Sequence, residues 1–138
     1  MRYVSPSAFF FFICWMIYDA DRQVPNFLIQ YSTQIPFGDK FGHIILYGML
    51  AFFLNYALGF RIIRKFGLNL QTGALWVLAF AFFEECTQVF FPSRTLSLAD
   101  AICDVIGVVL FSYLGLYVQR VVRRFWPIEG LPVKNEIE

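Results

Sequence analysis

The sequence predicts an all-α integral membrane protein, built as a bundle of about four transmembrane helices. The chain has 138 residues, is 59% hydrophobic and only 15% charged, and has a mean hydropathy of +0.61, all far from a soluble average. Several apolar segments approach the length that crosses a bilayer. A net charge of +1 argues against a nucleic-acid partner.

The first apolar segment, residues 4–18, includes a block of four phenylalanines. It is short against the ~20 residues that normally span a bilayer. Arg2 precedes it, as in a signal peptide, but Ile17-Tyr18-Asp19 offers no small-residue cleavage pattern. Whether this segment is retained in the mature protein therefore stays open.

Three further segments, residues 41–60, 72–91 and 98–118, are each long enough to span. Together with the first they form one predicted transmembrane domain, residues 1–125. The tail, residues 126–138, mixes Pro, Gly and charged residues without an apolar face. We expect it to be a loosely ordered cytoplasmic end.

The basic residues predict the orientation. With four spans and a cytoplasmic N-terminus, eight of the eleven Lys and Arg face the cytoplasm, namely Arg2, Arg61, Arg64, Lys65, Arg120, Arg123, Arg124 and Lys134. The other three, Arg22, Lys40 and Arg94, lie outside. This is the bias of cytoplasmic loops, so both termini are predicted to be cytoplasmic.

In this orientation the polar residues of the spans gather at the outer face. They recur at intervals of four residues, so that each set lies on one helix face: Asp39, His43 and Tyr47; Glu84 and Gln88; Asp100 and Asp104. Charged residues at membrane depth are functional candidates by default. The predicted ligand-binding set is Asp39, Lys40, His43, Tyr47, Glu84, Glu85, Gln88, Arg94, Asp100 and Asp104.

Carboxyl groups are in excess in this set. Five acids stand against Lys40, Arg94 and one titratable histidine, which is unfavourable at low dielectric unless a carboxyl is protonated or a cation enters. Glu84 and Glu85 lie ~100° apart around a helix, so both face inward only in a wide bundle. Gln88 follows Glu84 by one turn and favours Glu84 as the central residue. The competing interpretation is a structural network that fastens the helices.

Asn55 and several small residues predict how the helices pack. Asn55 is expected to form a hydrogen bond between helices. Close helix contact, within one chain or in a homo-oligomer, is favoured by Gly42, Gly48, Ala51, Gly107 and Gly115. The three cysteines lack metal-ligand spacing and are expected to pack as small apolar side chains.

Three motifs link these residues to a known family. They are D-K-x-x-H-x-x-x-Y at residues 39–47, E-x-x-Q-x-x-x-x-x-R at residues 85–94, and D-x-x-x-D-x-x-G at residues 100–107. Over about residues 39–115 the chain resembles the VanZ-like membrane proteins. The family commonly has Asn where this chain has Asp104, and Gly where it has Ser93.

The resemblance implies a location in the bacterial cytoplasmic membrane and no established reaction. The family takes its name from a protein associated with low-level resistance to the glycopeptide teicoplanin. We therefore expect an outward-facing acidic pocket that binds a lipid headgroup, a cell-wall precursor or a cationic small molecule. Its expected partners are membrane lipids, with a lipid-linked precursor or a glycopeptide, and its binding would modulate envelope properties, including glycopeptide susceptibility.

An enzyme is the alternative, and the residues leave it open. A divalent metal held by Glu84, Glu85, Asp104 and His43 would suit chemistry on a lipid-linked phosphate. The spacing is not that of a dedicated metal motif, so no cofactor is predicted. Ser97 is the one outer-end candidate for a nucleophile. A transporter would need an oligomer, because the chain has no internal repeat.

Overall fold

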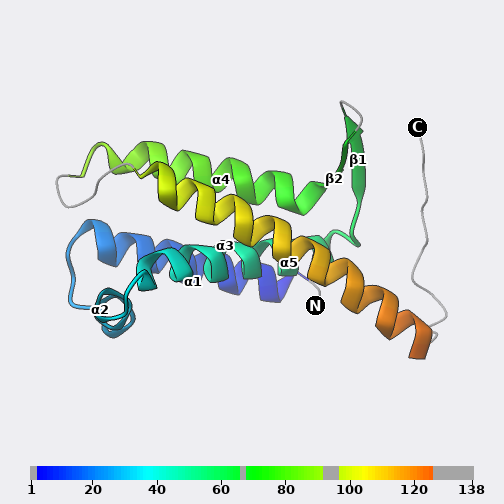
Figure 1. The fold of residues 1–138 in the computed structure, drawn as a ribbon, viewed down its shortest axis with the longest axis horizontal. Helices are drawn as coiled ribbons and strands as arrows, with labels where there is room; N and C mark the ends of the chain where they lie inside the picture. The colour runs from blue at the N-terminus through cyan, green and yellow to red at the C-terminus, as the bar shows by residue number, and fades with distance from the viewer. Residues whose placement is uncertain (1–2, 66–67, 92–96, 126–138) are drawn as a thin grey trace.

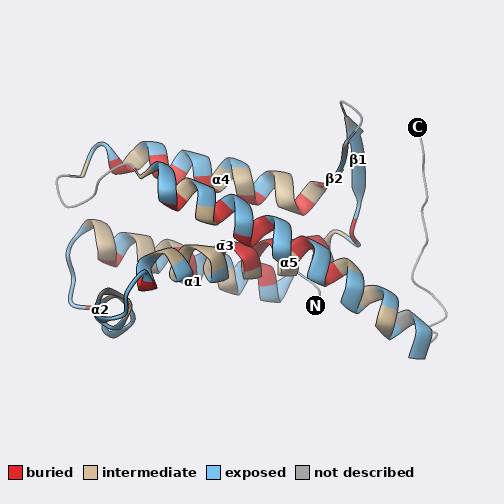
Figure 2. Ribbon diagram, in the orientation of Figure 1, coloured by how far each residue is buried: buried red, intermediate tan, exposed pale blue. Residues whose placement is uncertain are grey.

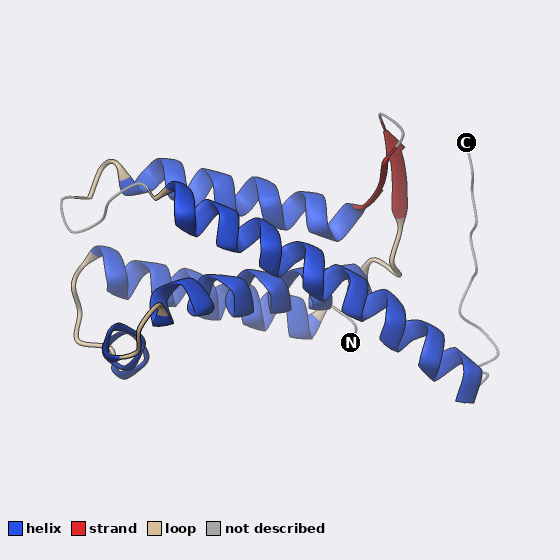
Figure 3. Ribbon diagram, viewed as in Figure 1, coloured by secondary structure: helices blue, strands red, loops and turns tan. Residues whose placement is uncertain are grey.

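The computed structural model describes residues 3–65, 68–91 and 97–125. These residues form five helices and one antiparallel hairpin (Figures 1 and 3). The helices are α1 (Val4–Asp21), α2 (Phe27–Gln34), α3 (Gly38–Ala57), α4 (Thr72–Gln88) and α5 (Leu98–Phe125), and the hairpin pairs β1 (Ile62–Lys65) with β2 (Leu68–Gln71). The prediction of a mostly helical chain is confirmed. The tail predicted at residues 126–138 lies outside the described residues.

The four longer helices run along the length of the molecule, and α3 contacts each of the other four helices. Helix α2, the loop after α1, the end of α4 and the start of α5 lie at one end, which we call the α2 end (Figure 1). The start of α1, the hairpin and the end of α5 lie at the other, the hairpin end (Figure 1). The start of α3, the end of α4 and the start of α5 therefore meet at the α2 end.

The four predicted segments correspond to α1, α3, α4 and α5, with ends that differ by a few residues. Helix α2 and the hairpin were not predicted. The eight residues of α2 are too few for a span, and the helix begins where the Asn26 side chain accepts a hydrogen bond from the Leu28 N–H at 3.0 Å. Helix α2 and the two strands are too short to be detected as membrane-length apolar segments.

Among the described helices, one is long and apolar enough to cross a membrane. It is the 25-residue stretch Leu98–Val122 within α5. Helix α4 has only 17 residues, while α1 ends with Asp19 and Asp21 and α3 begins with Asp39 and Lys40. By length and composition, α5 is thus the candidate membrane span among the described helices, and the four predicted spans stay a prediction.

The outer surface of the bundle is nevertheless apolar. Buried residues lie where the helices face one another, whereas the outward faces are exposed (Figure 2). Large exposed side chains include Trp76, Phe82, Phe83, Leu110 and Tyr113. Extended apolar surface of this kind marks a membrane or a protein partner. Cys86 also lies exposed on α4, so the expectation that it packs inside is wrong.

Two glycines allow α3 and α5 to approach closely. A Cβ atom at Gly107 would overlap the backbone carbonyl of Ile44 on α3. A Cβ atom at Gly48 would lie 2.9 Å from the backbone oxygen of Gly107. Gly42 was expected to act in the same way, but a Cβ atom there would meet none of the described atoms within 4 Å. The close contact is therefore centred on Ile44 and Gly48, about two to three turns after the start of α3.

The hairpin end is fastened by a small buried polar network. The Asn55 amide donates to the Ser112 hydroxyl at 3.0 Å, and its oxygen accepts from the Ala74 N–H at 3.2 Å. Gln71, just before α4, donates to the Ser112 carbonyl at 3.1 Å. The interhelix role predicted for Asn55 is confirmed, and its hydrogen bonds join α3, α4 and α5.

Candidate functional site

The polar stripes of α3, α4 and α5 meet near the α2 end of the bundle. We use the name acidic cluster for six side chains: His43, Tyr47, Glu84, Glu85, Gln88 and Asp104. The close contact of α3 with α5 and the packing of α4 against both bring these side chains together. The predicted convergence of three helix faces is therefore present.

His43 and Asp104 form the link between α3 and α5. His43 Nδ1 lies 2.9 Å from Asp104 Oδ1, and the Asp104 residue is only 1% exposed. The second oxygen, Asp104 Oδ2, is buried and has no hydrogen-bond partner among the described residues. Buried carboxylate oxygens are normally paired, so this atom retains the capacity to accept a bond.

Tyr47, Glu84 and Gln88 form the link between α3 and α4. The Tyr47 hydroxyl donates to Glu84 Oε2 at 3.3 Å, and the Gln88 amide donates to Glu84 Oε1 at 2.9 Å. The expected pairing of Glu84 with Gln88 along one face of the helix is confirmed. The hydrogen bond between Tyr47 and Glu84 was not predicted from the sequence.

Glu85 faces the interior as well. Both glutamates are only 4% exposed, so neither is turned away to the surface. Glu85 Oε2 accepts from the Ser97 N–H at 3.2 Å, and the Gln88 amide lies 3.5 Å from Glu85 Oε1. The bundle is thus wide enough at this level for two adjacent acidic side chains.

Ser97, considered above as a nucleophile, has a different role in the structure. Its hydroxyl accepts from the Asp100 N–H at 3.3 Å and caps the first turn of α5, while its own N–H binds Glu85. The contact between the Ser97 N–H and Glu85 was not predicted from the sequence. The available signal was a serine directly before an apolar helical segment, which marks the start of a helix.

Lys40 and Asp100 lie about one turn before His43 and Asp104 on their helices. Lys40 Nζ is 3.1 Å from Asp100 Oδ1. The ammonium therefore offsets the charge of that carboxylate. Asp39 is exposed on α3 beside this pair. Arg94, the other predicted cation, lies outside the described residues.

A second polar pair at the α2 end is separate from the cluster and was not predicted. The Asn26 amide donates to Asp19 Oδ2 at 2.7 Å, and both residues are buried. Since Asn26 also caps α2, the pair fixes this helix against the end of α1. We assign it a structural role.

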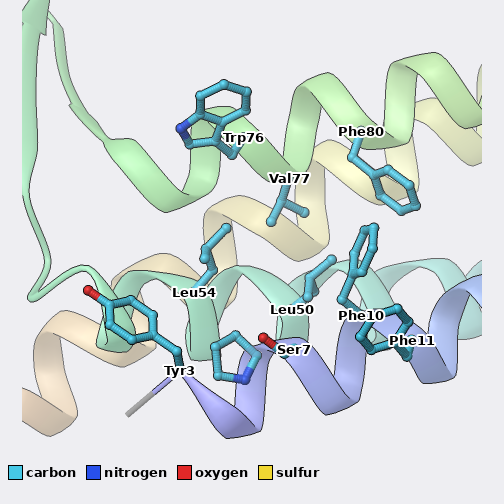
Figure 4. A pocket seen from close by; sticks show the side chains of 10 residues that line it. Tyr3, Ser7, Phe10, Phe11, Leu50, Leu54, Trp76, Val77 and Phe80 are labelled. Atoms are coloured by element: carbon cyan, nitrogen blue, oxygen red, sulfur yellow. The ribbon is translucent and has the colours of Figure 1, made fainter.

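An apolar groove of about 390 Å³ lies between α1, α3 and α4 (Figure 4). Its walls include Phe10 of α1, Leu50 of α3, and Val77 and Phe80 of α4 (Figure 4). The ring of Phe80 also lies 6.1 Å from that of Tyr47, measured between centroids. The groove therefore borders the acidic cluster on the side of the hairpin end.

Comparison with known proteins gives one match. A family described as VanZ/LLP1 matches residues 7–122, a range that contains the whole acidic cluster. No curated protein and no solved structure matches the chain. The match agrees with the resemblance carried by the three sequence motifs and extends it to α1.

Proposed function

The chain belongs to the VanZ/LLP1 family, and from this premise we propose that it is a four-span protein of the bacterial cytoplasmic membrane whose acidic cluster binds a ligand from outside. The part of the ligand that enters the cluster is positively charged. It belongs to a lipid headgroup, a lipid-linked cell-wall precursor or a cationic small molecule. Binding then modulates envelope properties, including susceptibility to teicoplanin.

The observation that carries this proposal is the balance of buried charge. Glu85 and Asp104 are both nearly inaccessible, and among the described residues the titratable cation beside them is His43. Two buried carboxyl groups beside one imidazole are costly at low dielectric unless positive charge enters or protons bind. A ligand amine would offset that cost and could bond the available Asp104 Oδ2.

The adjoining groove favours an amphipathic ligand among these candidates. It is lined by apolar side chains and borders the cluster at Phe80. A molecule with a charged head and an acyl tail could place the head among the carboxyl groups and the tail along the helices. Lipids and lipid-linked precursors have this form, whereas a compact cation would leave the groove unused.

The surface of the bundle supports the membrane assignment. α5 is long and apolar enough to span, and the other long helices carry large exposed apolar side chains. Arg61 and Arg64 lie at the hairpin end, and Arg120 and Arg124 lie near the end of α5 (Figure 1). The positive-inside bias places that end in the cytoplasm, with both termini. The cluster, nearer the α2 end, then faces out.

This orientation predicts which surface residues can be labelled in intact cells. A single cysteine in place of Val24, in the loop before α2, should react with a membrane-impermeant maleimide. The matched variant Ile63→Cys, on β1, should react only after permeabilisation; both positions are exposed. The background should have serine at Cys14, Cys86 and Cys103. The opposite labelling pattern would invert the proposed orientation.

Ligand binding predicts a loss on replacing Asp104 with Asn. This change keeps the shape and can keep the bond to His43, but removes the buried charge. Losing one partner of a buried charge pair costs about 2–5 kcal/mol of binding, so retention of the ligand should fall by about 30-fold or more. Lipid analysis of protein purified in native-membrane nanodiscs measures that retention, and the teicoplanin inhibitory concentration should fall in parallel.

Two comparisons make this test specific. Glu84→Gln should behave like Asp104→Asn, while Asp21→Asn, an equivalent change on α1 outside the cluster, should retain the ligand. An unchanged lipid profile in both cluster variants would refute the binding site. If both variants fail to accumulate in the membrane while Asp21→Asn does, the cluster is a structural network.

A further inference from the structure

We infer that His43, Glu85 and Asp104 form a binding site for one divalent transition-metal ion of the Zn²⁺ or Mn²⁺ class. The inference rests on the proposed function, in which the acidic cluster takes up positive charge, and it names a metal ion as that charge. The three residues come from α3, α4 and α5, so the ion would join all three helices.

The spacing of the donor atoms is that of a metal site. A ring nitrogen of His43 and one carboxylate oxygen each of Glu85 and Asp104 all lie within 4.8 Å of one another. Bonds of ~2.0–2.2 Å place two ligands of one ion between ~3.0 Å and ~4.4 Å apart, depending on their angle. Small side-chain rotations would complete the site.

A second observation points to a ligand at the same place. Asp104 is 1% exposed, and its Oδ2 atom has no hydrogen-bond partner among the described residues. A buried carboxylate oxygen without a partner loses its hydration without replacement. A coordinated cation would supply the missing interaction and would neutralise Asp104 and Glu85 together.

The surrounding residues hold these donors in place. The Ser97 N–H binds Glu85 Oε2, and among the described residues Glu85 Oε1 has the 3.5 Å contact to Gln88. Outer hydrogen bonds of this type orient carboxylate ligands in metal proteins. Three protein ligands would also leave a coordination position for water.

The donor types determine the class of ion. An imidazole nitrogen favours Zn²⁺ or Mn²⁺ over Mg²⁺ and Ca²⁺, which prefer oxygen alone. Asp39, His43 and Asp100 form a second group whose donor atoms have similar spacing. There Asp39 is exposed, and Asp100 is already paired with Lys40 at 3.1 Å. We therefore place the ion in the group formed by His43, Glu85 and Asp104, where the carboxylates are buried and Lys40 does not offset their charge.

Metal titration of the full-length protein tests this site. Chelator-stripped protein in nanodiscs should bind Zn²⁺ at a ratio of one to one by calorimetry, with a rise in melting temperature that Mg²⁺ at equal concentration does not produce. Glu85→Gln and Asp104→Asn should each weaken Zn²⁺ binding by about 100-fold or more. Mn²⁺ bound to the same protein should show nitrogen coupling in its electron spin resonance spectrum, and this coupling should be absent in His43→Gln.

The results separate this inference from the proposed function. No Zn²⁺ binding, together with lipid retention that still depends on Asp104, overturns the metal site and leaves the function standing. Zn²⁺ binding without any retained lipid, with or without metal, supports the metal site and overturns the function. Binding that survives both carboxylate variants, or that is lost in Asp39→Asn instead, assigns the ion elsewhere and also overturns the inference.

Discussion

Replacing His43 with Leu should destabilise the protein by about 3 kcal/mol, because it leaves Asp104 buried without its partner. The Asp104 side chain is 2% exposed and lies 2.9 Å from the histidine ring. Removing one member of a buried ion pair costs about 3–5 kcal/mol, and we expect the lower end here because the His43 side chain is 13% exposed. Denaturant titration in mixed micelles measures the loss.

The double variant His43→Leu/Asp104→Leu provides the matched control. With both polar groups replaced by apolar ones of similar volume, stability should return to within about 1 kcal/mol of the native protein. This recovery separates the cost of an unpaired buried charge from the loss of packing. A single variant as stable as the native protein would show that the pair is not buried as described. A double variant no better than the single one would point to packing instead.

The second large effect is expected at Gly107, where a larger side chain should force α3 and α5 apart. A Cβ atom there overlaps the Ile44 carbonyl, and backbone cannot move aside as a flexible side chain can. Overpacking costs about 1–3 kcal/mol, and we expect Gly107→Val to reach the upper end. The same separation would pull His43 away from Asp104, so stability and binding should be lost together.

Gly42→Val is the control for this substitution. It introduces the same side chain into a helix, with the same change in helix propensity, at a site where no described atom lies within 4 Å of the added Cβ. It should therefore leave the melting temperature almost unchanged. Equal effects of the two substitutions would mean that propensity, and not the contact between α3 and α5, determines the loss.

The residues of the site were predictable, but some of their contacts were not. Spacing by four along a helix places His43 and Tyr47 on one face, and Glu84 and Gln88 on another, whatever surrounds them. Which acid meets which partner depends on the offset between helices. The Gly107 contact fixes that offset for α3 and α5. This offset brings His43 to Asp104, and the packing of α4 against α3 brings Glu84 to Tyr47.

The smaller elements show the limits of sequence patterns in another way. Helix α2 and the hairpin are too short for a hydropathy window to detect. The sequence signals for these elements are local, such as Asn26 before α2. Ser97 was missed for a different reason, because its backbone N–H reaches Glu85 only where α4 and α5 lie side by side. Such contacts depend on the packing of elements that are distant in the sequence.

By itself, the sequence determined the helical composition, the family and the polar residues that meet in the acidic cluster. It could do so because helical periodicity and hydrophobicity are properties of single segments. The tertiary structure decided that Glu84 and Glu85 are both buried, that Asp104 keeps one oxygen without a partner among the described residues, and that Lys40 neutralises Asp100. These features depend on how closely three helices approach, and side-chain volume at their contacts determines that distance.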